Sequence, residues 1–268
     1  EIHKGLGNSN KILFELIQKL NSDFDVKICS IEGGGLRNAI PRESSVIISF
    51  NEDNLNSFKK IMKNASQTLL DEFKETDDKL NLEFELLHHE VQTLSTIESK
   101  ELINAINDCP NGVFEMSKSI DGLVETSNNL ANIKLSEGKL KIQCLTRSSS
   151  ENSKEVLSKI ISNIFKNIGC DYEFSGGYPG WEPNMNSATL KKVKNSYIKL
   201  FSSKPKVNVI HAGLECGIIG SHYPEMDMIS FGPTILGAHS PDEKASISST
   251  QKFWKFFKEV LANIPQKS

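Results

Sequence analysis

The sequence predicts an α/β protein in two parts. The first is an α+β domain with helices over one face of an antiparallel sheet, and the second is a shorter part in which helices and strands alternate. Up to about residue 175, amphipathic helices and alternating strands are mixed along the chain. The stretch SEGK (136–139) is typical of a β-hairpin turn. SGGYPGWEPN (175–184), with its glycines and prolines, marks a domain junction.

The first part is expected to begin with a helix at SNKILFELIQKL, where apolar residues recur at helical spacing behind a Ser/Asn cap. STIESKELINAIND carries a capping box, Ser95 with Glu98. The expected helices are 9–20, 52–75, 95–108 and 153–168. The expected strands lie within 25–35, in the second half of 38–50, and at 80–90, 122–134 and 139–147.

The second part is expected to contain helices at 187–202 and 249–264 and short strands at 207–212 and 226–231. The last helix carries an apolar stripe, which indicates core packing rather than a cofactor site. The members of this stripe are Phe253, Phe256, Phe257, Val260, Leu261 and Ile264. The part is thin for a domain of its own and looks like half of one.

Composition limits the classes of function. The 268 residues carry 31 basic and 34 acidic side chains, a formal charge of -3, so nothing favours nucleic acid or an anionic membrane as a partner. No apolar run approaches the roughly 20 residues that span a bilayer. Five scattered cysteines without CxxC spacing indicate reduced thiols in a cytoplasmic protein.

The loop GAHSPDE (237–243) places His239 among small residues and next to a proline. Small neighbours would leave room for a metal-bound substrate, and Asp242 or Glu243 could orient the imidazole. Zinc needs three or four protein ligands, and no HxxxH or HxxE pattern accompanies this histidine. A polar loop is therefore the alternative to a metal ligand.

HAGLECG (211–217) places His211, Gly213 and Glu215 where a strand runs into a turn and a helix. The carboxyl ends of strands face the ligand crevice of open α/β sheets. The alternative is a buried histidine at the strand end, with Glu215 capping the helix.

Two further stretches could bind a substrate. Asn38, in GGGLRNAIPRE (33–43), could donate its amide to a substrate carbonyl, and Arg147, in CLTRSSSEN (144–152), could offer a guanidinium fork to a carboxylate. The alternatives are a flexible hairpin loop and a surface charge. His88 and His89 are interpreted as structural, because adjacent strand positions face opposite sides of a sheet.

Taken together, several stretches resemble the aminoacyl-histidine dipeptidases, which are Xaa-His dipeptidases of the co-catalytic zinc exopeptidase clan. They are IHKGLGNSNK, NAIPRE, SGGYPGWEPN, VIHAGLECG, MDMISFGPTILGAHSPDE and FWKFFKEVLANIP. The resemblance runs from residue 1 to about 265. It implies a lid or dimerisation domain at 1–178 and the C-terminal portion of a split catalytic domain at 179–268.

The resemblance also implies roles for individual residues. His239 matches a zinc ligand, and Asn38 and Arg147 match lid positions that bind the substrate carbonyl and C-terminal carboxylate. His211, Gly213 and Glu215 fall where relatives line the substrate pocket. The family uses two zinc ions that share a bridging water and a glutamate base.

The chain begins just after the stretch that precedes IHKG in relatives, so we expect a partial chain without the N-terminal catalytic half. No catalytic residue is then expected in it, and the portion alone is expected to be inactive. The expected partners are a dipeptide and a second copy bound through the lid. The alternatives are a non-catalytic lid and dimerisation module, or another amidohydrolase of the clan, such as a deacylase.

Overall fold

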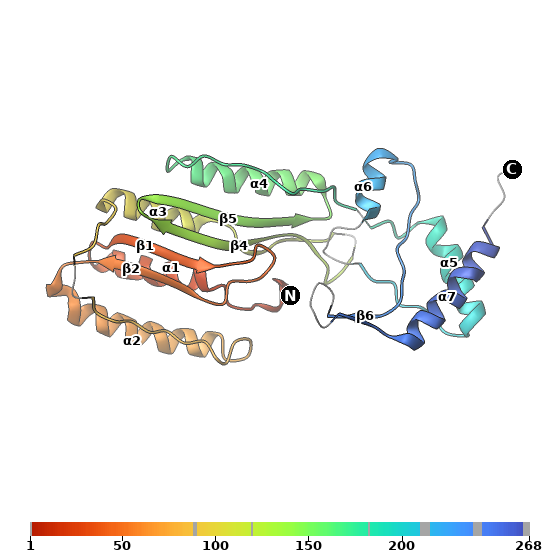
Figure 1. The fold of residues 1–268 in the computed structure, drawn as a ribbon, viewed down its shortest axis with the longest axis horizontal. Helices are drawn as coiled ribbons and strands as arrows, with labels where there is room; N and C mark the ends of the chain where they lie inside the picture. Colours follow the sequence, from red (N-terminus) through yellow and green to blue (C-terminus); the bar gives the residue numbers. More distant parts are fainter. Residues whose placement is uncertain are drawn as a thin grey trace. The chain divides into compact units, whose positions relative to one another are not determined.

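The computed structural model describes residues 2–87, 90–118, 120–181, 183–209, 215–237 and 243–264 (Figure 1). The chain divides into two compact units, Glu1–Gly177 and Tyr178–Ser268. None of the helices in the described ranges is long and apolar enough to cross a membrane.

The first unit is built on a five-stranded antiparallel sheet. Its strands are β1 (Lys27–Gly34), β2 (Ser44–Ser49), β3 (Gly112–Met116), β4 (Val124–Ser136) and β5 (Lys139–Ser148). Along one edge β4 pairs with β5, and along its other edge it pairs with both β1 and β3. β2 pairs with β1 and lies at the margin of the sheet. This arrangement, with the helices described next, confirms the expected fold class.

Four helices accompany the sheet, each near its expected place. They are α1 (Ser9–Asp23), α2 (Leu55–Glu72), α3 (Thr96–Asp108) and α4 (Glu151–Lys166), with short 3-10 turns η1 (Ile2–Lys4) and η2 (Glu52–Asn54). The predicted capping box of α3 is present, since Ser95 and Glu98 each accept the other's backbone N–H. Side chains such as Phe14, Ile103 and Leu157 pack in one core with Ile133 of β4.

The residues of this core show which face of the sheet the helices cover. On β5, Leu140, Ile142 and Cys144 pack against the core, and α4 runs along the strand (Figure 1). Because side chains alternate along a strand, Leu145 and Arg147 lie on the opposite face.

The β4–β5 hairpin confirms the SEGK prediction. Glu137 and Gly138 form its two-residue loop with φ of 52° and 72°. Positive φ at both positions is the geometry of a type I′ turn, whose twist matches that of the strands.

The predicted strand at 80–90 is wrong for the residues that the structure describes there, 80–87 and 90, since none of them is in a strand. Leu82 packs against the core, and the Phe84 ring meets that of Phe58 edge-on at 5.0 Å between centroids. Phe84 nevertheless stays 47% exposed, so the alternating apolar pattern does not mark a buried face here. His88 and His89 lie outside the described residues.

The second unit contains α5 (Ala188–Phe201), α6 (Glu215–His222) and α7 (Ile247–Ala262), with a two-residue pairing of β6 (Ile235–Leu236) and β7 (Lys244–Ala245). Both long helices were predicted. Tyr197 of α5 and Phe231 pack on Phe256 of α7, with ring centroids 5.1 and 5.2 Å away. Phe256 is the only large apolar side chain buried in the described part of this unit.

The two strands predicted in this unit are not found in its described residues. Neither 207–209 nor 226–231 is in a strand, and 210–212 lie outside the described range. A short apolar run becomes a strand only when another strand satisfies its backbone, and neither segment has one among the described residues. The sequence analysis also missed β3, β6 and β7.

Candidate functional site

Arg147 lies near the end of β5, opposite Ser127 of β4. Its Nε is buried, and among the described residues it has no hydrogen-bond partner. An unsatisfied buried donor costs about 1–3 kcal/mol. A guanidinium with such a donor, on the face without helices, is suited to receive an anionic acceptor such as a carboxylate.

Asn38 lies in the loop 35–43, which joins β1 to β2. Residues 36–39 form a turn closed by the N–H of Ala39 on the carbonyl of Leu36 at 3.1 Å, and the Asn38 side chain is exposed. Gly34, which precedes the loop, has a φ of +74°, and a Cβ there would collide with the carbonyl oxygen of Ala131. The close approach of β1 to β4 at the start of the loop therefore requires glycine.

The loop is tied to the sheet by a side chain that the sequence analysis did not select. Nδ2 of Asn129 donates to the carbonyls of Arg37 at 3.2 Å and Ala39 at 2.7 Å, one on each side of Asn38. Asn129 pairs with Leu145 in the ladder in which Ser127 pairs with Arg147. The structure therefore brings the Asn38 loop and Arg147 to the same end and face of the sheet.

A sequence signal for this side chain exists. Asn128 and Asn129 are consecutive in the longest predicted strand, and asparagine is depleted in strands. Both side chains are buried. A buried amide needs a hydrogen-bond partner, so two asparagines in a strand indicate polar contacts to other parts of the chain.

Other asparagines complete the backbone of β4 in the gap between β1 and β3. The N–H of Leu130 donates to Oδ1 of Asn111 at 3.0 Å, and its carbonyl accepts from Asn8 at 3.2 Å and Asn10 at 3.1 Å. These side chains stand where a neighbouring strand would otherwise satisfy β4. Asn8 also caps α1, since its Oδ1 accepts from the N–H groups of Asn10 and Lys11.

Two groups with shifted pKa values have structural roles. Burial lowers the pKa of Lys11, whose Nζ donates to carbonyls where α3 ends, including that of Ile106 at 3.0 Å and that of Cys109, just after the helix, at 3.1 Å. The hydrogen bond to Cys144, and then burial, raise the pKa of the Cys109 thiol. The Lys11 ammonium is occupied by backbone carbonyls, and a buried, protonated thiol is a poor nucleophile, so neither group indicates catalysis.

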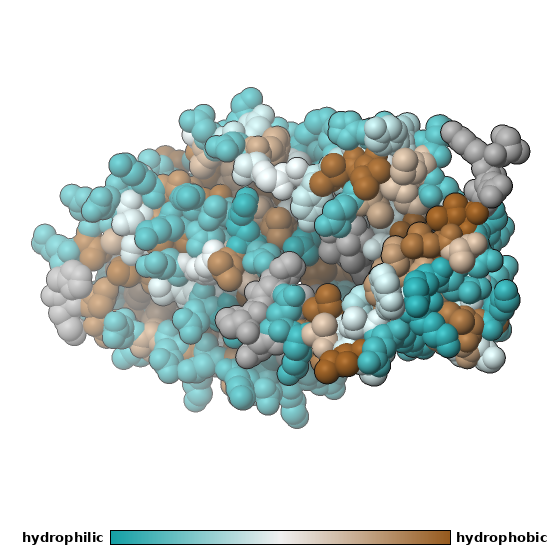
Figure 2. Space-filling view, turned by 45° about the vertical axis from the view of Figure 1, so that its right-hand side comes forward, coloured by the Kyte–Doolittle hydropathy of each residue, from teal (hydrophilic) through white to brown (hydrophobic). Residues whose placement is uncertain are grey.

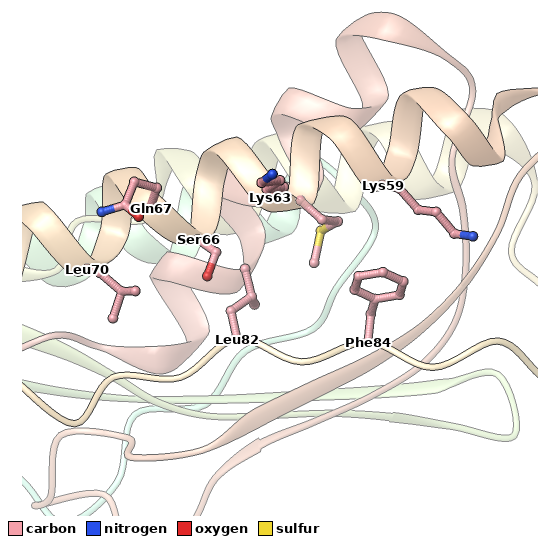
Figure 3. Close-up of a pocket in the computed structure, with 8 residues that line it drawn as sticks. Lys59, Lys63, Ser66, Gln67, Leu70, Leu82 and Phe84 are labelled. Carbon is pink, nitrogen blue, oxygen red and sulfur yellow. The ribbon is translucent and has the colours of Figure 1, made fainter.

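A cavity of about 490 Å³ lies between α2 and the segment that follows it (Figure 3). Met62, Leu70, Leu82 and Phe84 supply its apolar lining, and Lys59 is among its polar residues. It holds no carboxylate, histidine or cysteine, so its lining offers no acid–base pair or metal-ligand set. Its side chains are those that hold residues 82–84 against α2.

In the second unit, Glu215 is the first residue of α6 and is exposed. A carboxylate in the first turn interacts favourably with the helix dipole, which accords with the alternative that Glu215 caps the helix. His211, Gly213 and His239 lie outside the described residues. Within the described ranges, no group of three His, Cys, Asp or Glu side chains could hold a metal ion.

Comparisons with known proteins agree with the expected resemblance. Residues 1–77 match a family model described as a peptidase dimerisation domain. The chain is 37% identical over 267 residues to the cytosol non-specific dipeptidase of Escherichia coli strain K12. The aligned region covers 100% of this chain and 55% of that dipeptidase. It also superposes on the crystal structure of aminoacylhistidine dipeptidase from Vibrio alginolyticus with a TM-score of 0.91 and 36% identity, again over 100% of this chain and 55% of the other.

These findings confirm the resemblance to the dipeptidases. The chain spans about half the length of each of these relatives.

Proposed function

We propose that this chain is part of a metal-dependent dipeptidase that hydrolyses Xaa-His dipeptides. The observation that carries the proposal is the position of Arg147 at the same end and face of the sheet as the Asn38 loop, with a buried Nε that has no partner among the described residues. The similarity to two dipeptidases over the entire chain supports the same reading.

In this proposal Arg147 binds the C-terminal carboxylate of the dipeptide. A charge-assisted fork fixes both the position and the direction of a carboxylate, and it disfavours substrates that lack one. Asn38 donates its side-chain amide to the substrate carbonyl from a turn that the N–H of Ala39 closes on the carbonyl of Leu36.

His211, Gly213 and Glu215 are proposed to line the substrate pocket, and His239 to bind zinc. The described residues do not by themselves provide the ligands of a zinc pair. The roles assigned to the described side chains are therefore limited to binding and orienting the substrate.

The surface of the second unit supports the proposal that this chain is part of a longer protein. Figure 2 shows apolar patches on this unit. Its exposed large apolar side chains include Ile218, Ile219, Tyr223, Met226, Ile235, Leu236, Trp254 and Leu261. Exposed apolar patches of this kind favour a covering partner. We assign that cover to the part of the dipeptidases that this chain does not span, as in a split catalytic domain at 179–268.

The domain expected at residues 1–178 is proposed to act as the lid and to form a two-fold homodimer. The region that matches the dimerisation domain, residues 1–77, contains β1 and β2. Only the outer edge of β2 in that region lacks a strand neighbour among the described residues. Unpaired edges join readily to other strands, and two-fold pairing of identical edges is the commonest closed arrangement. A cytoplasmic location is proposed from the scattered free cysteines and from the cytosolic relative.

Substrate profiling of the protein in its full natural length tests this function. Xaa-His dipeptides, their N-acetylated amino-acid counterparts and an unrelated ester would be compared at equal concentration. We expect hydrolysis of the dipeptides only. Preferential cleavage of the acetylated amino acids would indicate a deacylase. If the metal-loaded protein cleaves none of these compounds, the alternative of a non-catalytic binding and dimerisation module would be favoured.

A further inference from the structure

We infer that Asn129 is a positioning residue, which holds the Asn38 loop in a fixed place relative to Arg147. The inference rests on the proposed function of those two residues. Asn129 is 7% exposed, and its Nδ2 donates to the carbonyls of Arg37 and Ala39. A single amide therefore clamps the backbone on both sides of Asn38.

The orientation of this amide is determined by its neighbours. Two carbonyl oxygens can only accept, so Nδ2 must face the loop. Oδ1 of Asn129 accepts from Nδ2 of Asn8 at 3.3 Å. Asn8 cannot be reversed either, because its Oδ1 already accepts two N–H groups at the start of α1. The loop is thus connected through Asn129 to the helix cap.

The remaining anchors of the loop lie at its ends and at its surface. The N–H of Gly34 donates to the carbonyl of Glu43 at 3.0 Å, and that of Ser9 to the carbonyl of Pro41 at 3.1 Å. Nη1 of Arg37 reaches Oγ of Ser175 only at 3.5 Å, and both are exposed. Among the described residues, Asn129 is the buried side chain whose hydrogen bonds hold the middle of the loop.

The register connects this clamp to Arg147. Asn129 pairs with Leu145, and Arg147 is two residues farther along β5 on the same face. Diagonal neighbours of this kind lie about 7–8 Å apart on an antiparallel sheet. A shift of the loop therefore changes the spacing between the two substrate-binding groups and leaves both groups chemically intact.

Asn132 offers a matched control on the same strand. Its Nδ2 also donates to two backbone carbonyls, those of Gly33 at 3.2 Å and Gly34 at 3.1 Å. These belong to the end of β1, before the loop. Each of the two asparagines donates two hydrogen bonds to backbone carbonyls. Asn129 holds the middle of the loop, whereas Asn132 holds the end of β1.

The experiment compares wild type, Asn129→Asp and Asn132→Asp in the protein of full natural length. Aspartate keeps the shape of asparagine but has no donor at neutral pH. Amide hydrogen exchange over residues 35–43 is measured beside KM and kcat for an Xaa-His dipeptide. For Asn129→Asp we expect exchange in the loop to rise at least about tenfold and KM to rise about 5- to 50-fold, with kcat changed less. For Asn132→Asp, loop exchange and KM should stay within about threefold of wild type.

Unchanged loop exchange in a folded Asn129→Asp protein would overturn the inference, and so would faster exchange with unchanged KM. Equal effects of the two substitutions on KM would do the same. If Asn129→Asp does not fold, Asn129→Ser gives the same comparison, because a short hydroxyl cannot reach both carbonyls. Failure of the wild type to hydrolyse dipeptides would instead contradict the proposed function, and loop exchange would still decide whether Asn129 holds the loop.

Discussion

Arg147 of β5 lies directly opposite Ser127 of β4, on the face of the sheet away from the helices, and its buried Nε has no hydrogen-bond partner among the described residues. A buried donor without a partner lowers the stability of the folded protein. We therefore expect Arg147→Met, which keeps an apolar stem, to leave the free energy of unfolding unchanged or to raise it by about 1 kcal/mol. Urea unfolding would measure the change.

Lys11→Met provides the contrast, because the Lys11 ammonium donates to three carbonyls at the end of α3. Loss of these partners should destabilise the protein by about 1–3 kcal/mol. A loss of stability in Arg147→Met as large as that in Lys11→Met would show that Arg147 has a structural role.

His239→Ala in the full-length protein should lose bound zinc and dipeptidase activity together, because removal of one ligand weakens a site that needs at least three. Metal analysis after gel filtration, with activity on the same fractions, measures both.

We expect this 268-residue chain by itself to bind no zinc pair and to cleave no dipeptide. Two tightly bound zinc ions per isolated chain would contradict this account of the metal site.

Asp227 gives the second unit a defined dependence on pH. The Ser187 hydroxyl, and then the N–H of Thr189, donate to its carboxylate and lower its pKa from 3.8. A lowered pKa stabilises the fold fully above pH 3.8, and this contribution is lost as the pH falls through the lowered value. Asp227→Asn should therefore flatten the pH dependence of the unfolding midpoint as the pH falls below 3.8. A slope identical to that of wild type would contradict this assignment.

Dimerisation should depend on the outer edge of β2. The N–H of Gly34 bonds to the carbonyl of Glu43, so antiparallel alternation directs the N–H of Val46 away from β1. Val46→Pro removes this outward donor and should yield a monomer by light scattering.

Ile142→Pro is the control for that substitution. It places proline at an outward N–H on β5, which forms the other margin of the sheet, and it should leave the dimer intact. A dimer that survives Val46→Pro but not Ile142→Pro would show that the wrong edge was chosen.

Local signals in the sequence predicted much of the fold. The Glu137-Gly138 turn and the Ser95 capping box depend on neighbours in the chain, and both are found as expected. The alternation at 80–90 predicted a strand, but none of the described residues there is in a strand, and Phe84 stays exposed beside α2. Apolar alternation alone therefore does not establish that a segment is buried or that it pairs with other strands.

The candidate site was predictable only in part. Asn38 and Arg147 were selected from a motif and from a strand end, and the structure brings them to the same end of one sheet face. Asn129 was missed because its partners, Arg37 and Ala39, are about 90 residues away in the chain. A buried polar side chain needs hydrogen-bond partners, and a local sequence pattern cannot predict partners that are so distant in the chain.

The most direct test of the central claim is a comparison of kcat/KM for an Xaa-His dipeptide and for its C-terminal amide, in wild type and in Arg147→Ala. The claim is that Arg147 binds the substrate carboxylate. Wild type should prefer the acid by a factor worth about 2–4 kcal/mol, and Arg147→Ala should lose most of that preference by cleaving the acid more slowly. Lys141→Ala, which removes a cation from the same face of β5, should retain the preference. An Arg147→Ala enzyme that still prefers the acid as strongly as wild type would contradict the claim.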